Sequence, residues 1–367
     1  MLHVPGGNTD NEHSDTHEAP AIPEGITTVH RATLREVADQ AGVHPATASR
    51  ALNSATEAMV NATTAARIQK VAKELGYSPN PIARSLKTSR SSSIGLIIPD
   101  LTNPLFPPIV RGVEDVLRPV GYNAWIVNTD NRQDVEARAV ESIRQRNVEG
   151  FVFATAHLHH PLLEEMAASS TPMVLINRRL ASADIPSVTS DDAAGVALAM
   201  QHLVELGHRN IVHLAGPQDL STGVNRRRAF RENLEERGLP NEAERVAVCD
   251  SWSEDAGARA MLHLLDSDVP FTAVLAGNDL LALGAFDALA ERGISCPGAI
   301  SVIGFNDMPF MDKVNPPMTT VRIPHYEIGA EAARLLLEVL TDPGRHPRSL
   351  LLPLTLVVRG STGPAAS

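Results

Sequence analysis

The chain has 367 residues, of which 43% are hydrophobic and 4% aromatic, so it is long enough for two or three domains with their own cores. Its two cysteines, Cys249 and Cys296, offer no disulfide framework, and we expect both to act as small apolar residues. Residues 1–30 contain no Lys or Arg and no long apolar run, which predicts that no signal peptide is present. No later stretch has the apolar length of a membrane helix. We therefore expect a cytoplasmic protein with a disordered acidic leader over residues 1–30.

The formal net charge of −11 is unevenly distributed along the chain. Residues 1–30 carry five acids and no bases, whereas residues 31–90 carry nine bases and four acids. A basic segment attached to an acidic body is the pattern expected when only one part of a protein touches phosphate groups. Residues 31–90 are therefore the candidate nucleic-acid-binding part.

The first part of this basic segment has the pattern of two short helices joined by a tight turn. Thr33 and Glu36 form a capping box, apolar residues follow at helical spacing, and Gly42 ends the first helix. Pro45 suits the first turn of a second helix, which we expect to run to Asn53. Such a pair predicts a helix-turn-helix whose second helix enters the major groove of DNA.

The second helix carries the candidate DNA contacts. Arg50 has the chemistry for a bidentate contact to guanine, and the hydroxyl and amide side chains beside it suit phosphate oxygens. A third helix is expected from about Asn61 to a stop at Gly76. A small helical bundle with a solvated basic face would fit the same pattern. The DNA-binding residues predicted in this module are Thr33, Pro45, Ala46, Thr47, Ser49, Arg50 and Asn53.

The motif Tyr77-Ser-Pro-Asn-Pro-Ile-Ala-Arg-Ser-Leu-Lys-Thr88 follows directly. Together with Thr33–Asn53 and Val60–Tyr77, it makes residues 31–361 resemble the LacI/GalR (lactose-repressor) family of bacterial regulators. The resemblance implies a DNA-binding domain over residues 31–78 and a hinge over residues 79–90 that becomes helical only on operator DNA. Leu86 matches the leucine that wedges between base steps. The hinge positions that the resemblance assigns to DNA contact are Asn80, Ala83, Leu86 and Lys87.

The sequence departs from the family pattern at three places. His44 stands where a serine usually caps the second helix, so we expect a differently made cap. The stretch between Asn53 and Val60 is longer than usual, and Ala65 replaces a common arginine that would contact the DNA backbone.

From Ser93 onward, apolar strands alternate with helical segments, which predicts parallel sheets with right-handed crossovers. This α/β pattern suits two Rossmann-like lobes that hold a ligand at the carboxyl ends of their strands. The strands are expected at residues 93–98, 122–127, 150–154, 172–176, 211–214, 246–249, 273–275 and 299–304. The helices are expected at residues 106–120, 134–146, 160–168, 193–206, 222–237, 253–265 and 279–292.

The resemblance implies that these lobes form a periplasmic-binding-protein-like core over residues 91–361, which also mediates dimerisation. It places the crossings between lobes near Ser190, Arg322 and Leu352. Lobe 1 would then hold about residues 91–189 and 323–351, and lobe 2 about residues 190–322 and 352–361.

Polar and aromatic side chains follow the ends of the expected strands, where a ligand would lie. Arg226 matches a position that often holds a ligand hydroxyl or carboxylate, and Trp252 matches an aromatic that stacks on the ligand. One aromatic face with several hydrogen-bonding groups suits a sugar ring. Asn306 stands where sugar-binding relatives often have Asp, which leaves the ligand chemistry open. The ligand-binding residues implied by the resemblance are Asn103, Phe106, Asn177, Arg178, Asp192, Arg226, Trp252, Asn278 and Asn306.

Simpler roles fit some of these residues equally well. Asp192 and Asn278 could be helix N-caps, and Asn177 and Arg178 could belong to a solvated loop.

Two other classes of protein share parts of this pattern. A periplasmic or sensory sugar receptor would have the core but not the basic head. An enzyme is disfavoured because the chain has no Gly-rich phosphate loop, zinc motif, nucleophile elbow or CxxC pair. His157, His159 and His160 could hold a metal, but a surface turn with no acid or cysteine nearby is the simpler interpretation.

The sequence thus predicts a transcription regulator, most simply a repressor, with no catalytic residue, cofactor or metal. We expect it to act away from membranes. Its expected partners are palindromic operator DNA, a second copy of the chain, and a sugar or related metabolite.

Overall fold

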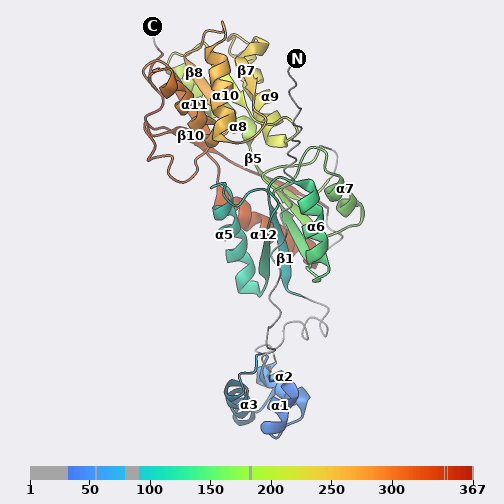
Figure 1. Cartoon of the computed structure of the whole chain (residues 1–367). Coiled ribbons are helices and arrows are strands. Elements are labelled where there is room, and N and C mark those ends of the chain that lie inside the picture. The colour runs from blue at the N-terminus through green and yellow to red at the C-terminus, as the bar shows by residue number, and fades with distance from the viewer. Residues whose placement is uncertain are drawn as a thin grey trace, which may run out of the picture. The chain divides into compact units, whose positions relative to one another are not determined.

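The computed structural model describes residues 32–53, 56–78, 91–181, 184–342, 344 and 346–365 (Figure 1). The chain divides between Pro81 and Ile82 into two compact units. The expectations for the leader and for the hinge residues Asn80, Ala83, Leu86 and Lys87 lie outside the described residues. Within the described ranges, no helix is both long and apolar enough to cross a bilayer.

The first unit contains α1 (Leu34–Gln40), α2 (Pro45–Ala51), the 3₁₀ turn η1 (Glu57–Met59) and α3 (Ala62–Glu74). The capping box of α1 is confirmed, because Thr33 accepts from the amide of Glu36 at 3.3 Å and donates its own amide to the Glu36 carboxylate at 2.6 Å. Gly42 and Gly76 both have positive φ and end their helices as predicted. The prediction that α2 reaches Asn53 was wrong, since the helix ends at Ala51.

Two of the positions in this unit that depart from the family sequence pattern, His44 and Ala65, have local structural explanations. The imidazole Nδ1 of His44 accepts a hydrogen bond from the amide of Ala46 at 3.2 Å, so a histidine makes the cap of α2. Ala65 lies at 4% exposure in the small core, packed with Val37 and Ile68. The position that usually carries an arginine is therefore part of the packed interior in this chain.

The second unit consists of two six-stranded sheets, each with helices packed against it (Figure 1). Inner strands of these sheets, such as those at Ser93–Ile98 and Gly150–Phe153, are buried on both faces and read as largely continuous apolar runs, which is typical of parallel sheets. Lobe 1 is built on the sheet order β11-β5-β4-β3-β1-β2, with β1 (Ser93–Ile98), β2 (Asn123–Asn128), β3 (Gly150–Phe153), β4 (Met173–Ile176), β5 (Ser187–Ser190) and β11 (Ser349–Leu352). Lobe 2 is built on the order β12-β10-β9-β8-β6-β7, with β6 (Ile211–Ala215), β7 (Val246–Val248), β8 (Ala273–Ala276), β9 (Ser301–Asn306), β10 (Thr319–Arg322) and β12 (Thr355–Val357).

All strand pairs are parallel except β10 with β12, so the predicted α/β fold class is confirmed. The chain passes between the lobes three times, after β5, after β10 and after β11. The helices of lobe 1 are α5 (Phe106–Leu117), α6 (Gln133–Arg144), α7 (Pro161–Ala168) and α12 (His325–Thr341), with the 3₁₀ turn η2 (Arg118–Val120). Those of lobe 2 are α8 (Asp192–Glu205), α9 (Ser221–Glu236), α10 (Glu254–Leu265) and α11 (Asp279–Glu291), with η3 (Ala243–Arg245).

Helices α5 and α12 of lobe 1 pack with their backbones in contact. A Cβ atom added to Gly112 would lie 2.1 Å from the carbonyl oxygen of Tyr326, and one added to Gly329 would lie 1.9 Å from that of Ile109. Only glycine allows so close an approach at these two positions.

Candidate functional site

A cavity lies between the two lobes, where strands of both sheets end. Its volume is about 30 Å³. Ligand pockets typically measure roughly 300–1,000 Å³, so the lobes have to move apart before a sugar-sized molecule can enter. The cavity is lined by Asn103, Leu105, Phe106, Asn177, Arg178, Thr222, Arg226, Trp252, Asn278 and Asn306.

The structure brings eight of the nine sequence-predicted ligand residues to this cavity. The ninth, Asp192, lies behind the wall and pairs with Arg226. Sequence reasoning missed Leu105 and Thr222. Thr222 stands one helical turn before Arg226 on α9, and that spacing was the available signal.

Three asparagines of the wall have distinctive conformations. Asn177 has a φ of 64°, in the left-handed region where asparagine is more common than most side chains, whereas Asn306 has a φ of 130°, which L side chains rarely adopt. Asn278 is the N-cap of α11, because its side-chain oxygen accepts from the amide of Leu281 at 2.8 Å. It therefore both caps a helix and lines the cavity.

Arg226 is held from two sides in the interior. Its Nε donates to Asp192 at 2.9 Å and its Nη1 to the carbonyl oxygen of Gly277 at 2.6 Å, and both charged side chains are buried. The guanidinium also lies over the ring of Phe305, 3.9 Å from its centroid. Burial raises the pKa of Asp192, although the hydrogen bonds from Arg226 and Ser190 oppose this. The cap of α8 is Asp191, so the N-cap interpretation of Asp192 was wrong.

Trp252 lies against the backbone of two neighbouring loops. A Cβ atom on Gly216 would come within 2.0 Å of the indole, and one on Gly277 within 3.0 Å. These glycines make room for the ring, which presents an aromatic surface to the cavity. Asn177 and Arg178 are 8% and 5% exposed, so the solvated-loop interpretation of these two residues was wrong.

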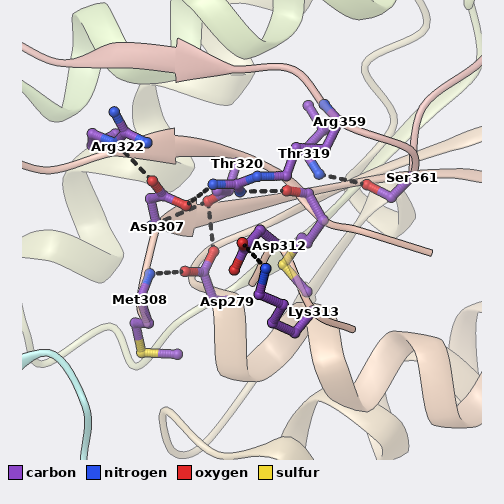
Figure 2. A network of polar contacts seen from close by, with 11 residues as sticks. Asp279, Asp307, Met308, Asp312, Lys313, Thr319, Thr320, Arg322, Arg359 and Ser361 are labelled. Carbon is purple, nitrogen blue, oxygen red and sulfur yellow. Dashed lines mark hydrogen bonds and ion pairs between the residues drawn. The ribbon is translucent and has the colours of Figure 1, made fainter. Parts of the chain in front are cut away.

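A polar network fixes the loop that follows Asn306, the last residue of β9 (Figure 2). Asp307 accepts hydrogen bonds from Arg322 and from Arg359, each at 2.7 Å. Asp279 accepts from the Thr320 hydroxyl at 2.6 Å and from the amide of Met308 at 2.8 Å, and burial raises its pKa to about 6. Nothing in the local sequence pattern predicted these contacts between distant segments.

Hydrogen bonds also join the lobes beside the cavity. The amide of Leu158 donates to the carbonyl oxygen of Asp219 at 2.8 Å, and the amide of Arg179 donates to the hydroxyl of Ser221 at 2.9 Å. The imidazole Nδ1 of His157 lies 3.0 Å from the Asp219 carboxylate. These contacts hold the two lobes together beside the cavity.

The histidine cluster differs from its sequence interpretation as a surface turn without nearby acids. His159 is exposed, but His160 is 1% exposed and its Nε2 lies 3.7 Å from a carboxylate oxygen of Glu136. Burial lowers the pKa of His160 to about 4. Among the described residues, no group of three His, Cys, Asp or Glu side chains is placed to hold a metal ion.

The first unit presents α2 with its predicted contact side accessible. Ala46 and Arg50 are exposed, and Pro45, Thr47, Ser49 and Asn53 are partly exposed. The remaining predicted contact, Thr33, is exposed at the N-cap of α1, where its hydroxyl also lies 3.0 Å from the Glu36 carboxylate.

A helix-turn-helix unit joined to a two-lobed α/β core with a cavity between its lobes defines a class of ligand-binding transcription regulators. Residues 33–80 match the model of bacterial regulatory proteins of the lacI family, and residues 200–362 match a periplasmic binding protein-like domain. The chain is 33% identical over 330 residues to the ribose operon repressor of Halalkalibacterium halodurans, which covers 90% of this chain and 97% of that protein.

Solved structures agree with this match. The lac repressor dimer bound to operator and the anti-inducer ONPF superposes with a TM-score of 0.81 at 26% identity, over 91% of this chain and all of that one. The complex of the transcriptional regulator CelR with cellobiose has a TM-score of 0.70 at 31% identity, over 90% of this chain and all of that one. The protein belongs to the LacI family of bacterial transcription regulators, which confirms the resemblance seen in the sequence.

Proposed function

We propose that this protein is a homodimeric repressor whose affinity for a palindromic operator is controlled by a sugar-like effector in the cavity between the lobes. The observation that carries the proposal is the ring of amides, guanidinium groups and one indole that converges on the cavity from both lobes. Such a set suits a hydroxyl-rich ring. Relatives solved with cellobiose and with ribose support the same ligand class.

This proposal assigns a function to each part of the chain. Residues 31–78 bind operator DNA, residues 79–90 form the hinge, and residues 91–361 bind the effector and the second copy of the chain. We assign base and phosphate contacts to the exposed side of α2 and to the N-cap of α1. The wall residues of the cavity contact the effector, with Asp192 positioning Arg226. An operator-binding repressor acts in the cytoplasm, and this function requires no catalytic group, metal or cofactor.

Effector control requires that effector and operator affect each other's binding. The cavity is too small for a sugar, so binding has to change the spacing of the lobes, and the effector must bind the two arrangements with different affinity. Linkage then requires operator DNA to change effector affinity by the same factor as effector changes operator affinity.

The corresponding experiment is calorimetric titration of the full-length protein with ribose and with cellobiose, in the presence and absence of an operator selected from random DNA. We expect a sugar that binds to show different dissociation constants in the two titrations. Equal constants would mean that the core does not regulate the DNA-binding unit.

Arg50→Ala is expected to weaken operator binding by about 1–3 kcal/mol per half-site and to relax the preference at one base pair. The reason is that Arg50 is the exposed arginine of α2 and can donate two parallel hydrogen bonds to a guanine. Gel-shift titration against the selected operator and its single-base variants measures both effects. Arg144→Ala removes the same charge from an exposed position on α6 and is the matched control. Unchanged base preference in Arg50→Ala would contradict the assignment.

A further inference from the structure

The charges around the cavity do not balance. Two arginines line it, together with uncharged asparagine, threonine, tryptophan, leucine and phenylalanine side chains. Arg226 is compensated by its ion pair with Asp192, in which both side chains are almost fully buried. Of the two arginines, only Arg178 has no such partner among the described residues.

Arg178 is buried without the contacts that a guanidinium needs. It is 5% exposed, and its Nε and Nη1 have no hydrogen-bond partner in the part of the chain that the structure describes. Burial lowers its pKa to about 10, which is still far enough above neutral pH to keep the group protonated. A buried charge without a partner is costly, so this site favours a ligand that supplies the missing acceptor and the opposite charge.

The two carboxylates that act electrostatically on Arg178 are engaged elsewhere. Asp219 lies 3.0 Å from the imidazole of His157. Glu136 accepts the hydroxyl hydrogen of Thr155 at 2.7 Å, and burial raises its pKa to about 7, so near neutral pH it carries only part of a negative charge. Neither forms an ion pair with Arg178 within the described residues.

We infer that the effector is anionic: a polyol or sugar that carries a carboxylate or phosphate group, with that group bound by Arg178. The inference rests on the proposed function and narrows its ligand class. The anion accepts from the unpaired guanidinium donors, while the asparagines, Arg226 and Trp252 contact the uncharged remainder of the molecule. Charge-assisted contacts of this kind are stronger than neutral ones, which makes Arg178 the residue that selects the anion.

The test compares anionic ligands with their neutral counterparts by calorimetry on the full-length protein. Suitable pairs are gluconate with glucitol, glucuronate with glucose, and ribose 5-phosphate with ribose, so that carboxylate and phosphate are separate arms. We expect an anionic member to bind at least tenfold more tightly than its neutral partner. Arg178→Met should abolish that preference, whereas Arg179→Met, which removes an exposed arginine next in the chain, should leave it intact. Tighter binding of a neutral member overturns the inference but leaves the proposed function standing.

A measurement on the ligand-free protein tests whether the Arg178 charge is unpaired, even if none of these probes binds. If Arg178 is uncompensated, Arg178→Met should raise the thermal unfolding midpoint of the ligand-free protein or leave it unchanged. Arg179→Met again serves as the control. A clear fall in the midpoint for Arg178→Met alone would show that the charge is already paired within the protein, and the inference would be wrong.

Discussion

Arg226→Met is expected to lower the free energy of unfolding by about 3–5 kcal/mol, because it leaves the Asp192 carboxylate buried and unpaired. The substitution also removes the donor to the carbonyl oxygen of Gly277. Chemical denaturation of the ligand-free protein measures the loss. The control is Arg228→Met on the same helix, whose ion pair with Glu232 is exposed and should contribute no more than about 1 kcal/mol.

A double substitution separates the buried charge from the shape of the side chains. Asp192→Leu combined with Arg226→Met removes both charges and should recover most of the stability lost in the single variant. If Arg226→Met alone proved as stable as the parent, the hydrogen bond from Ser190 would be enough to stabilise the buried Asp192 side chain, and the prediction would be wrong. Arg226 therefore has a structural role in addition to the proposed ligand contact, so loss of effector response in its variants has to be interpreted alongside stability.

Glu136→Gln is expected to stabilise the protein above pH 7 and to remove about 3 kcal/mol of pH dependence. Burial raises the pKa of Glu136 from 4.5 to about 7 in the folded state. Between these values the folded protein binds the proton more tightly than the unfolded chain does, so this group makes stability fall as pH rises. The neutral amide of glutamine can still accept from Thr155 and carries no charge to lose.

The measurement is urea denaturation of parent and variant at pH 5 and at pH 8. Buried histidines act in the opposite direction: burial lowers the pKa of His160, His213 and His325 to about 4, so they disfavour the folded state as pH falls below the ordinary value of 6.5. The informative quantity is therefore the difference between Glu136→Gln and the parent at each pH. Glu165→Gln, at an exposed position on α7, should show no such difference. Parallel stability curves for Glu136→Gln and the parent would contradict the prediction.

The parts of the fold that follow local rules could be predicted from the sequence. The capping box at Thr33, the proline start of α2 and the glycine stops depend on residues within one helical turn. Strands such as β1 and β9 are buried on both faces, so their apolar runs were visible without knowledge of their neighbours.

The strands and the α-helix that the sequence did not predict are β5, β10, β11, β12 and α12, which follow or precede the crossings between lobes. The strand β5 reads Ser-Val-Thr-Ser and β10 reads Thr-Thr-Val-Arg, without an apolar run. Their hydroxyls are buried because distant residues satisfy them, as when Ser187 donates to Ser349 across to β11. Such partners are 162 positions apart and leave no periodic signal.

In the candidate site, too, some features could be predicted from the sequence, whereas others depend on contacts between distant residues. Eight of the ten wall residues of the cavity were predicted, because parallel strands bring their carboxyl ends to one edge of a sheet and because the family resemblance marks positions there; Leu105 and Thr222 were not. The pairing of Arg226 with Asp192, the network around Asp307 and the burial of His160 beside Glu136 could not be predicted. Each of these depends on which side chains the tertiary fold brings together. The local sequence around an Asp or Glu does not indicate whether its carboxylate will be buried.

Because their backbones are in contact, we expect α5 and α12 of lobe 1 to move together as one rigid pair. Phe106, the first residue of α5, is part of the cavity wall, and α12 begins three positions after the crossing at Arg322. Because glycines leave no side chains between these helices at Gly112 and Gly329, rotamer changes cannot absorb a displacement at these two points of contact. Helix α5 has 12 residues and so spans about 18 Å. We therefore expect a shift of the cavity wall to be transmitted to the opposite edge of lobe 1, where Ser93 begins β1.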